Sequence, residues 1–266
     1  MAEILLRGTN LGPVSGVLFD KDGTLSLSEA KLITLAKARV FLCLQRVDPG
    51  QQPELQNLLE RAYGLSACGT LLHPAGTTAV AHRDHNLIST ATALAQVGLG
   101  WPEALATSEA VFAEADANAE ADGQRRPHGR PTSDTTAGLL PLLGQLQAAG
   151  VLCAVISNDD VAGIEHFLAS HQLRPFFAGI WSAEHRPRKP DPGAIHGLCA
   201  ELGLAVEQCL LIGDANSDLQ MAVAAGIPQH RSLGYTAAWS TPPPLAESHP
   251  LIHHWNELTV LAAPGK

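Results

Sequence analysis

The stretch Gly16–Leu25, GVLFDKDGTL, decides how the chain is organised. An apolar run leads directly into two carboxylates, Asp20 and Asp22, and then into a Gly-Thr pair. The run is short and rich in β-formers, which is typical of a strand buried on both faces of a parallel sheet. Two carboxylates at the end of such a strand are costly, because burial and mutual repulsion both disfavour their charged forms. The pair therefore indicates a functional site.

Three further segments have the same form, an apolar run that stops at polar residues: Leu152–Asp159, Phe176–Glu184 and Cys209–Asp218. Between and beside them, leucines at helical spacing predict helices over about 135–150, 160–173, 192–204 and 217–226. This alternation predicts an α/β fold, a Rossmann-like parallel sheet wrapped by helices, with ligands at the carboxyl ends of the strands. Gly12-Pro13, before the first strand, is expected to form a turn.

A long insertion interrupts this alternation. Roughly a hundred residues, from about Leu27 to Thr132, exceed what a parallel crossover needs and are too many for a loop. Their periodicity predicts helices over 28–47, 53–65, 78–99 and 102–121. We therefore expect a core domain made of 1–26 and 133–266, and an inserted all-α domain made of 27–132. The polar stretch 122–134 would be the return linker.

The composition excludes several classes of protein. The chain has 266 residues, 45% of them hydrophobic, and a net charge of −9, which disfavours binding to the phosphate backbone of nucleic acids. Five scattered cysteines form no CxxC pair, which indicates reduced thiols. No apolar run reaches the ~18 residues of a membrane span, and the start lacks a signal peptide's apolar region. We expect a cytoplasmic protein that binds neither nucleic acid nor membranes; its oligomeric state stays open.

Polar residues of complementary chemistry stand at or near the predicted strand ends. In chain order they are Asp20, Asp22, Thr24, Ser157, Asn158, Lys189, Asp214 and Asp218. Clustered carboxylates need a cation, and sites with oxygen ligands alone suit Mg²⁺. A lysine can neutralise both a carboxylate and a phosphate, while hydroxyl, amide and backbone N–H groups can hold phosphoryl oxygens. This combination suits phosphoryl transfer, where stabilisation of charge contributes most of the rate.

Each of these residues also has a simpler interpretation. Asp214 or Asp218 could cap a helix, Ser157 could begin a turn, and Lys189 could be a solvated cation in a loop. The joint pattern is harder to explain in this way, because an acid pair, a hydroxyl, a cation and a second acid pair follow one another in order.

The same residues make the chain resemble the haloacid dehalogenase (HAD) superfamily, on its phosphatase side. The sequence DKDGT at 20–24 is similar to the family's DxDG[TV] motif, and VISN at 155–158 to its strand that ends in Ser or Thr. Lys189 in RKPDP and the sequence GDANSD at 213–218 are similar to the family's third and fourth motifs. The resemblance covers about residues 14–232, and the insert is similar to the family's helical cap of the C1 type. The stretch YGLSACGTLLHPAGTTAVAHRDH at 63–85 resembles a segment of phosphoglycolate-phosphatase-like members.

The resemblance implies a catalytic role for the first acid pair. Asp20 would be the nucleophile that forms an aspartyl-phosphate, and Asp22 would protonate the leaving oxygen and then activate water. Ser157, Asn158 and Lys189 would bind the phosphate, and Thr24 would support the first loop.

The resemblance also implies the ligands of a Mg²⁺ ion. These would be the Asp20 carboxylate, the backbone carbonyl of Asp22, and Asp214. Asp218 would complete the metal site, directly or through water, or would orient Lys189. Because dehalogenases of the family lack the second acid, Asp22 makes dehalogenation an unfavoured alternative.

We therefore expect a Mg²⁺-dependent phosphatase that hydrolyses a small phosphorylated metabolite, phosphoglycolate-like or a sugar phosphate. Two alternatives stay open: a phosphomutase of the β-phosphoglucomutase type, and a non-catalytic HAD-fold protein that binds a phosphorylated ligand. The inserted domain would act as a cap that excludes water and selects the substrate. Its candidate selectors are Arg83, His85, Arg125 and Arg130.

Overall fold

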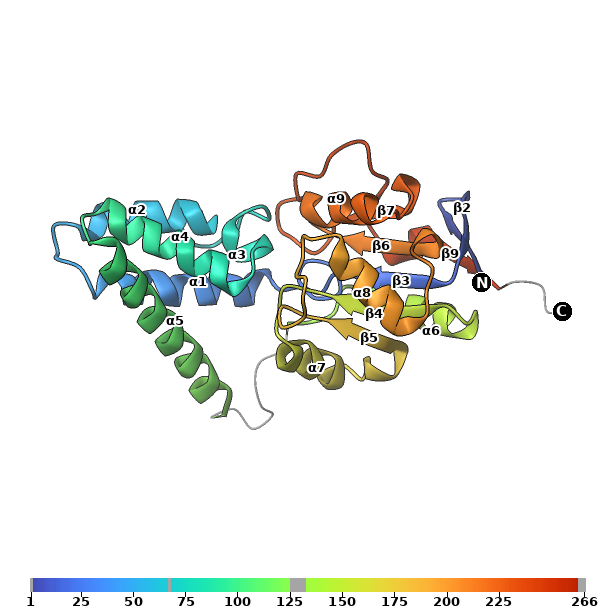
Figure 1. Cartoon of the computed structure of the whole chain (residues 1–266), viewed down its shortest axis with the longest axis horizontal. Coiled ribbons are helices and arrows are strands. Elements are labelled where there is room, and N and C mark those ends of the chain that lie inside the picture. Colours follow the sequence, from blue (N-terminus) through green and yellow to red (C-terminus); the bar gives the residue numbers. More distant parts are fainter. Residues whose placement is uncertain (1, 67, 125–132, 263–266) are drawn as a thin grey trace. The chain divides into compact units, whose positions relative to one another are not determined.

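The computed structural model describes residues 2–66, 68–124 and 133–262 (Figure 1). The chain divides into two compact units, one formed by Met1–Leu27 and Asp134–Lys266, the other by Ser28–Ser133. Arg125 and Arg130, and most of the expected return linker, lie outside the described residues. No helix in the described part of the chain combines the length and the apolar character that a membrane crossing requires.

The first unit is built on a six-stranded sheet in which all neighbouring strands are parallel, in the order β5-β4-β3-β6-β7-β8. Its strands are β3 (Gly16–Phe19), β4 (Leu152–Ile156), β5 (Phe177–Trp181), β6 (Cys209–Gly213), β7 (Ser232–Tyr235) and β8 (Leu251–Ile252). Every residue of β3 and β6 is buried, as expected for central strands covered on both faces. The prediction of an α/β fold with a parallel sheet is confirmed.

The register of the central strands aligns their carboxyl ends. Phe19, the last residue of β3, pairs with Val155 on one side and with Ile212 on the other. The backbone N–H of Asp20 continues the ladder by donating to the Ile212 carbonyl at 2.9 Å. The polar residues that follow β3, β4 and β6 therefore leave the sheet at one edge, where parallel sheets place their ligands.

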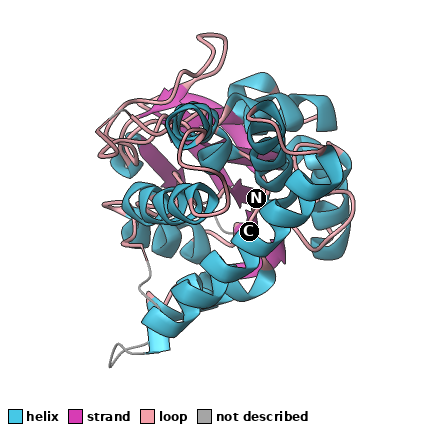
Figure 2. Ribbon diagram, turned by 90° about the vertical axis from the view of Figure 1, so that its left-hand side faces the viewer, coloured by secondary structure: helices cyan, strands magenta, loops and turns pink. Residues whose placement is uncertain are grey.

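The described residues of this unit form four α-helices: α6 (Leu139–Ala148), α7 (Val161–Ser170), α8 (Gly193–Leu202) and α9 (Asn216–Ala225). Helices α8 and α9 cover one face of the sheet, where Leu18, Ile156 and Leu211 pack against side chains such as Ile195 and Leu219. Figure 1 shows α8 across β4 and β5, and Figure 2 colours the helices cyan and the strands magenta. The four helices were predicted from sequence, with ends displaced by a few residues.

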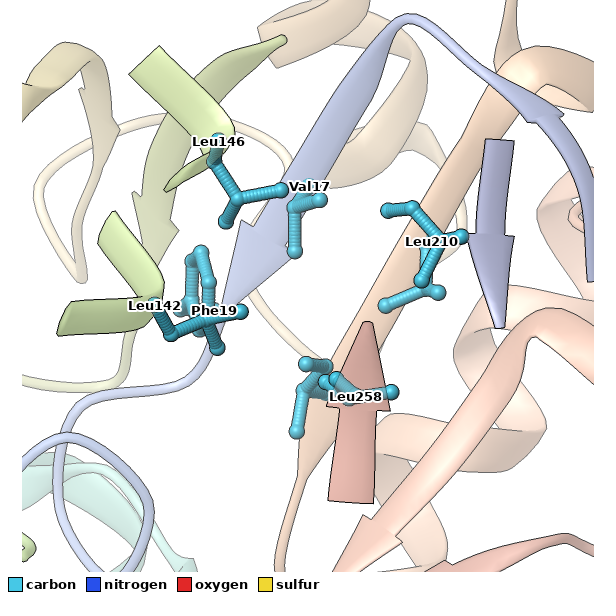
Figure 3. A pocket seen from close by; sticks show the side chains of 8 residues that line it. Val17, Phe19, Leu142, Leu146, Leu210 and Leu258 are labelled. Carbon is cyan, nitrogen blue, oxygen red and sulfur yellow. The ribbon is translucent and has the colours of Figure 1, made fainter. Parts of the chain in front are cut away.

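The opposite face of the sheet packs against α6 and a second, smaller sheet. Because successive strand residues point to opposite faces, Val17 and Phe19 lie here while Leu18 faces α8 and α9. Their packing leaves a void of about 10 Å³. Figure 3 shows its apolar lining, formed by Ile4, Val17, Phe19, Leu142, Leu146, Leu210, Ile212 and Leu258. A void this small and this apolar is a packing gap with no room for a ligand.

The smaller sheet is antiparallel, in the order β2-β1-β9, and was not predicted. Its strands are β1 (Ala2–Leu6), β2 (Thr9–Val14) and β9 (Leu258–Leu261). Arg7 and Gly8, both at positive φ, form the two-residue hairpin loop between β1 and β2. The expected turn at Gly12-Pro13 is wrong, since both residues lie within β2. Burial alternates along β1, but its sequence, AEILL, ends in three consecutive apolar residues and gave little signal for this hairpin.

The second unit is helical throughout its regular elements: α1 (Glu29–Leu44), α2 (Gln52–Tyr63), α3 (Thr77–Val80), α4 (Arg83–Gln96) and α5 (Trp101–Gln124). Leu55, Leu59, Leu94 and Phe112 are fully buried and form its interior. Helix α4 packs against α2 and α5, and α1 packs against α5. The single helix expected over 78–99 is wrong, because extended backbone at Ala81 and His82 separates α3 from α4.

Candidate active site

Three buried carboxylates converge at the carboxyl edge of the parallel sheet. Asp20 follows β3, Asp214 follows β6, and Asp218 lies in the first turn of α9. One oxygen of each lies within 4.8 Å of the others. Their residues are only 7%, 4% and 4% exposed, so water screens little of the repulsion between them. The register of β3 and β6 brings the first two together, and the turn into α9 adds the third.

Lys189 lies among these carboxylates. Its Nζ is 2.7 Å from Asp20 Oδ1 and 2.8 Å from Asp218 Oδ1, and it also donates to the Ile156 carbonyl at 3.3 Å. Burial alone would lower the pKa of Lys189, but Asp20 and Asp218 together outweigh it and raise that pKa above its ordinary value. The ammonium is therefore charged. The interpretation of Lys189 as a solvated loop cation is wrong, since it is 6% exposed.

The simpler interpretation of the second acid pair as helix caps is also wrong. The N-cap of α9 is Ala215, and no side chain caps this helix. Asp214 accepts a hydrogen bond from the indole N–H of Trp239 at 2.6 Å, and Asp218 pairs with Lys189. Both acids thus point away from the helix backbone and into the cluster.

The cluster carries more negative charge than the protein neutralises. Burial raises the pKa of Asp20 to about 6, with a further contribution from Asp218, although Lys189 opposes the change. Burial and the nearby Asp20 and Asp218 raise the pKa of Asp214 well above its ordinary value. When all three carboxylates ionise, one ammonium leaves two negative charges uncompensated. Oxygen ligands and this excess charge fit a hard divalent cation such as Mg²⁺.

This imbalance predicts a pH-dependent stability for the metal-free protein. A carboxyl group with a raised pKa stabilises the fold while it is protonated, and this contribution is lost as the pH rises from about 4 through about 6. Asp20→Asn removes the titration. We expect its unfolding free energy, relative to wild type, to increase by up to about 3 kcal/mol between pH 4 and pH 7.

Urea unfolding with a chelator, at several pH values, measures this difference. Both proteins share every other titrating group, so their difference isolates the carboxyl group of residue 20. A difference that stays constant across this range would contradict the raised pKa of Asp20.

Gly23, in the loop after β3, fits closely against the cluster. Its φ of +83° belongs to the left-handed region that favours glycine. A Cβ at this position would overlap the carboxylate of Asp214 and lie 2.5 Å from Trp239 Nε1. The first motif thus needs glycine for two reasons, the backbone conformation and the close approach of two side chains from other parts of the chain.

Comparison of Gly23→Ala with Gly8→Ala separates these two reasons. Gly8 has the same φ of +83°, but a Cβ there would meet no described atom within 4 Å. Both variants carry the strain of a left-handed alanine, while Gly23→Ala must also displace Asp214 or Trp239. We expect Gly23→Ala to lower the free energy of unfolding, measured in urea, by about 1–3 kcal/mol more than Gly8→Ala does. Equal losses would show that the close approach carries no energetic weight.

Asp22 is not one of the three clustered carboxylates, although its charge adds to the raised pKa of Asp20. Asp22 Oδ2 forms an ion pair with Lys21 Nζ at 2.6 Å, and the same Nζ pairs with Asp159 Oδ2 at 3.0 Å. Lys21 is 3% exposed; burial lowers its pKa, but the two carboxylates outweigh that effect and raise it. Sequence reasoning missed Lys21 and Asp159. A cation between two acids in the first motif was the available signal for Lys21.

The remaining predicted residues lie near this edge of the sheet. Ser157 is buried directly after β4, and its hydroxyl accepts from the Asp159 N–H at 3.2 Å. Asn158, which follows it, is half-buried. Thr24 is fully buried, and its carbonyl accepts from the Thr136 hydroxyl at 2.9 Å, which ties the first loop to the segment before α6.

The two candidate selectors that the structure describes make contacts within the helical unit. Arg83 donates from Nε and Nη2 to Asp116 at 3.1 and 2.9 Å. The His85 ring lies against the ring of His82, with the centroids 3.6 Å apart and the ring planes tilted by 37°.

Comparisons with known proteins agree with the motifs. The model of the family described as haloacid dehalogenase-like hydrolase matches residues 14–226, so the resemblance found in the sequence is confirmed. Phosphoglycolate phosphatase of Vibrio cholerae is 30% identical over 132 residues, which are 49% of this chain and 54% of that protein. Phosphoglycolate phosphatase of Pseudomonas savastanoi is 32% identical over 116 residues, 43% of this chain and 42% of that one. The chain spans about half the length of the curated relatives it matches.

Solved structures share the fold. A predicted phosphoglycolate phosphatase from Haemophilus somnus has a TM-score of 0.60 at 19% identity, covering 92% of this chain and 96% of that one. A haloacid dehalogenase-like hydrolase from Streptococcus pneumoniae has a TM-score of 0.55 at 19% identity, with the same coverage. At this identity the likeness establishes the architecture alone.

Proposed function

The chain belongs to the haloacid dehalogenase-like hydrolase family, and on that premise we propose that it is a Mg²⁺-dependent phosphatase acting on a small phosphomonoester. The observation that carries the proposal is the buried cluster of Asp20, Asp214 and Asp218 around Lys189 at the carboxyl edge of the sheet. A carboxylate nucleophile lies beside an ammonium, and the excess negative charge of the cluster can bind a divalent cation. This combination suits phosphoryl transfer.

In the proposed reaction, the Asp20 carboxylate attacks phosphorus, and the bond from phosphorus to the ester oxygen breaks. Lys189 neutralises charge on Asp20 and on the phosphoryl group, and the Ser157 hydroxyl and the Asn158 amide hold phosphoryl oxygens. Asp22 gives its proton to the leaving oxygen, then takes a proton from the water that attacks phosphorus. The bond from phosphorus to the Asp20 oxygen breaks in this second step, which releases phosphate and restores both carboxyl groups to their initial states.

The proposed Mg²⁺ ligands are the carboxylates of Asp20, Asp214 and Asp218, with the backbone carbonyl of Asp22. When bound, Mg²⁺ would neutralise the excess negative charge and stabilise the charge of the transferring group. The pKa of Asp20, about 6, supports this assignment. The carboxyl group is mostly ionised at neutral pH, so it can both bind a cation and attack phosphorus.

We also propose that the helical unit acts as the cap that determines which phosphomonoester is hydrolysed. Its insertion in the chain between β3 and α6 supports this role. Exchanging 28–133 for the corresponding segment of a family member with a different substrate should change substrate preference. Unchanged preference would contradict the role. The cytoplasmic location stays a prediction from the sequence.

A panel of phosphomonoesters tests the function, with phosphate release measured in Mg²⁺ and in a chelator. Phosphoglycolate heads the panel, because the relatives named above are phosphoglycolate phosphatases. Mg²⁺-dependent release of phosphate supports the proposal. Conversion of a sugar 1-phosphate to its 6-phosphate would identify a mutase instead. Saturable binding without turnover of any ester would identify a non-catalytic phospho-ligand-binding protein.

A further inference from the structure

We propose that Trp239 is a positioning residue for the divalent-cation site, and that its indole N–H fixes the orientation of the Asp214 carboxylate. The donor Nε1 lies 2.6 Å from Asp214 Oδ2, and the two residues are 7% and 4% exposed. This bond directs Oδ2 toward the indole, and we assign Oδ1 to the cation. The inference rests on the proposed function only in that Asp214 is taken to be a cation ligand.

The chemistry of the indole suits this role. An indole N–H donates a hydrogen bond, does not titrate and carries no charge. It can therefore hold a carboxylate without competing electrostatically with a bound cation. Lys189 pairs with the other two acids of the cluster and neutralises part of their charge. Trp239 adds no formal positive charge beside Asp214, so it orients the carboxylate without neutralising it, as partners behind metal ligands commonly do.

The segment that carries Trp239 is anchored beside the site. It follows β7, and its continuation is tied to the start of α9 by Asn216. The Asn216 side chain donates to the Pro244 carbonyl at 2.7 Å and accepts from the Ala246 N–H at 2.8 Å. Leu245 packs on the apolar cluster shared by α8 and α9. The helix that supplies Asp218 therefore also anchors the segment that supplies Trp239.

Close packing of Gly23 limits the movement of Asp214 and Trp239. Gly23 lies so near that a Cβ there would overlap the Asp214 carboxylate and reach 2.5 Å from Trp239 Nε1. Gly23 and the indole both lie close to Oδ2, so this oxygen of the carboxylate has little room to move. Such preorganisation raises affinity because less orientational freedom is lost on binding.

Trp239→Phe tests the proposal, because it keeps an aromatic ring and removes the N–H. The measurement is the dissociation constant for Mg²⁺ alone, by calorimetry, without substrate. We expect binding about 10-fold weaker than in wild type. Trp101→Phe is the matched control, since Trp101 is 48% exposed and lies in the helical unit; it should bind Mg²⁺ like wild type. Wild-type affinity in Trp239→Phe would overturn the proposal.

A second measurement uses the wild-type protein and stands even if Trp239→Phe fails to fold. The four tryptophans give separate indole N–H resonances in nuclear magnetic resonance, and that of Trp239 is assigned by its through-space contact with Gly23. Trp181 and Trp255 donate to Pro187 and Thr136 instead. We expect saturating Mg²⁺ to shift the Trp239 resonance most. An unmoved Trp239 resonance would overturn the proposal.

These readouts separate the inference from the proposed function. Weakened Mg²⁺ binding in Trp239→Phe supports the positioning role even if no phosphomonoester is hydrolysed. Wild-type affinity in that variant, combined with Mg²⁺-dependent hydrolysis by the wild type, would leave the phosphatase assignment intact and remove Trp239 from it.

Discussion

Asp20→Asn is expected to abolish phosphomonoester hydrolysis, lowering kcat by a factor on the order of 10⁴ or more. An amide is a poor nucleophile, so the covalent step is lost. The change also weakens the pairing of residue 20 with the Lys189 ammonium, now 2.7 Å from the carboxylate. The loss should appear as a fall in kcat for every substrate, because each uses the same nucleophile. Initial rates on p-nitrophenyl phosphate in saturating Mg²⁺ measure it.

Asp160→Asn is the matched control for this substitution. Asp160 is exposed and caps α7 through the Gly163 N–H at 2.6 Å, and asparagine can keep that bond. The Asp160→Asn substitution makes the same chemical change in the same unit but away from the cluster. It should keep the wild-type kcat. Asp20→Asn must also remain folded, which its urea unfolding curve establishes. More than a tenth of the wild-type kcat in folded Asp20→Asn would contradict the nucleophilic role.

Lys189→Met is expected to impair both stability and activity. Removing the ammonium leaves Asp20 and Asp218 buried without their shared partner, which should destabilise the metal-free protein by about 3–5 kcal/mol at neutral pH. The loss should shrink as the pH falls, because protonation of Asp20 removes charge that Lys189 had compensated. Activity should fall about 10²–10³-fold, as for the loss of one group that stabilises transition-state charge.

Urea unfolding in a chelator and in excess Mg²⁺ checks this prediction. We expect Mg²⁺ to restore part of the lost stability, since a divalent cation can offset the same negative charge. Lys37→Met is the control, because Lys37 is an exposed lysine of the helical unit. A Lys189→Met protein as stable as Lys37→Met in the chelator would show that the ammonium does not balance the buried carboxylates.

The sequence predicted the parallel sheet and the clustered residues for one physical reason. Buried parallel strands read as continuous apolar runs, and each such run here stops where the strand ends. Asp20 and Asp214 follow their strands directly, so equal register brings them to one edge. Lys189 follows no strand directly, so strand register does not explain its place in the cluster; the sequence indicated it by its charge and by its position between the two acid pairs.

Other features left weaker signals or none. The β1–β2 hairpin shows no clear alternation of apolar and polar residues on either side of Arg7-Gly8, and nothing in the sequence pairs β1 with β9, which comes from the far end of the chain. Trp239 lies in a segment without periodicity, and its contact with Asp214 depends on how that segment folds back onto α9. Contacts of this kind depend on tertiary structure and are not encoded in local pattern.

The most direct test of the central claim is to trap the phosphoryl group on Asp20. In Asp22→Asn, p-nitrophenyl phosphate can still phosphorylate Asp20, because its leaving group needs no proton from residue 22. The second step lacks its base, so the intermediate should accumulate. Acid quenching and mass spectrometry are predicted to find one added phosphoryl group on the peptide that contains Asp20. Release of p-nitrophenol at a measurable rate, with that peptide unmodified throughout, would contradict the account.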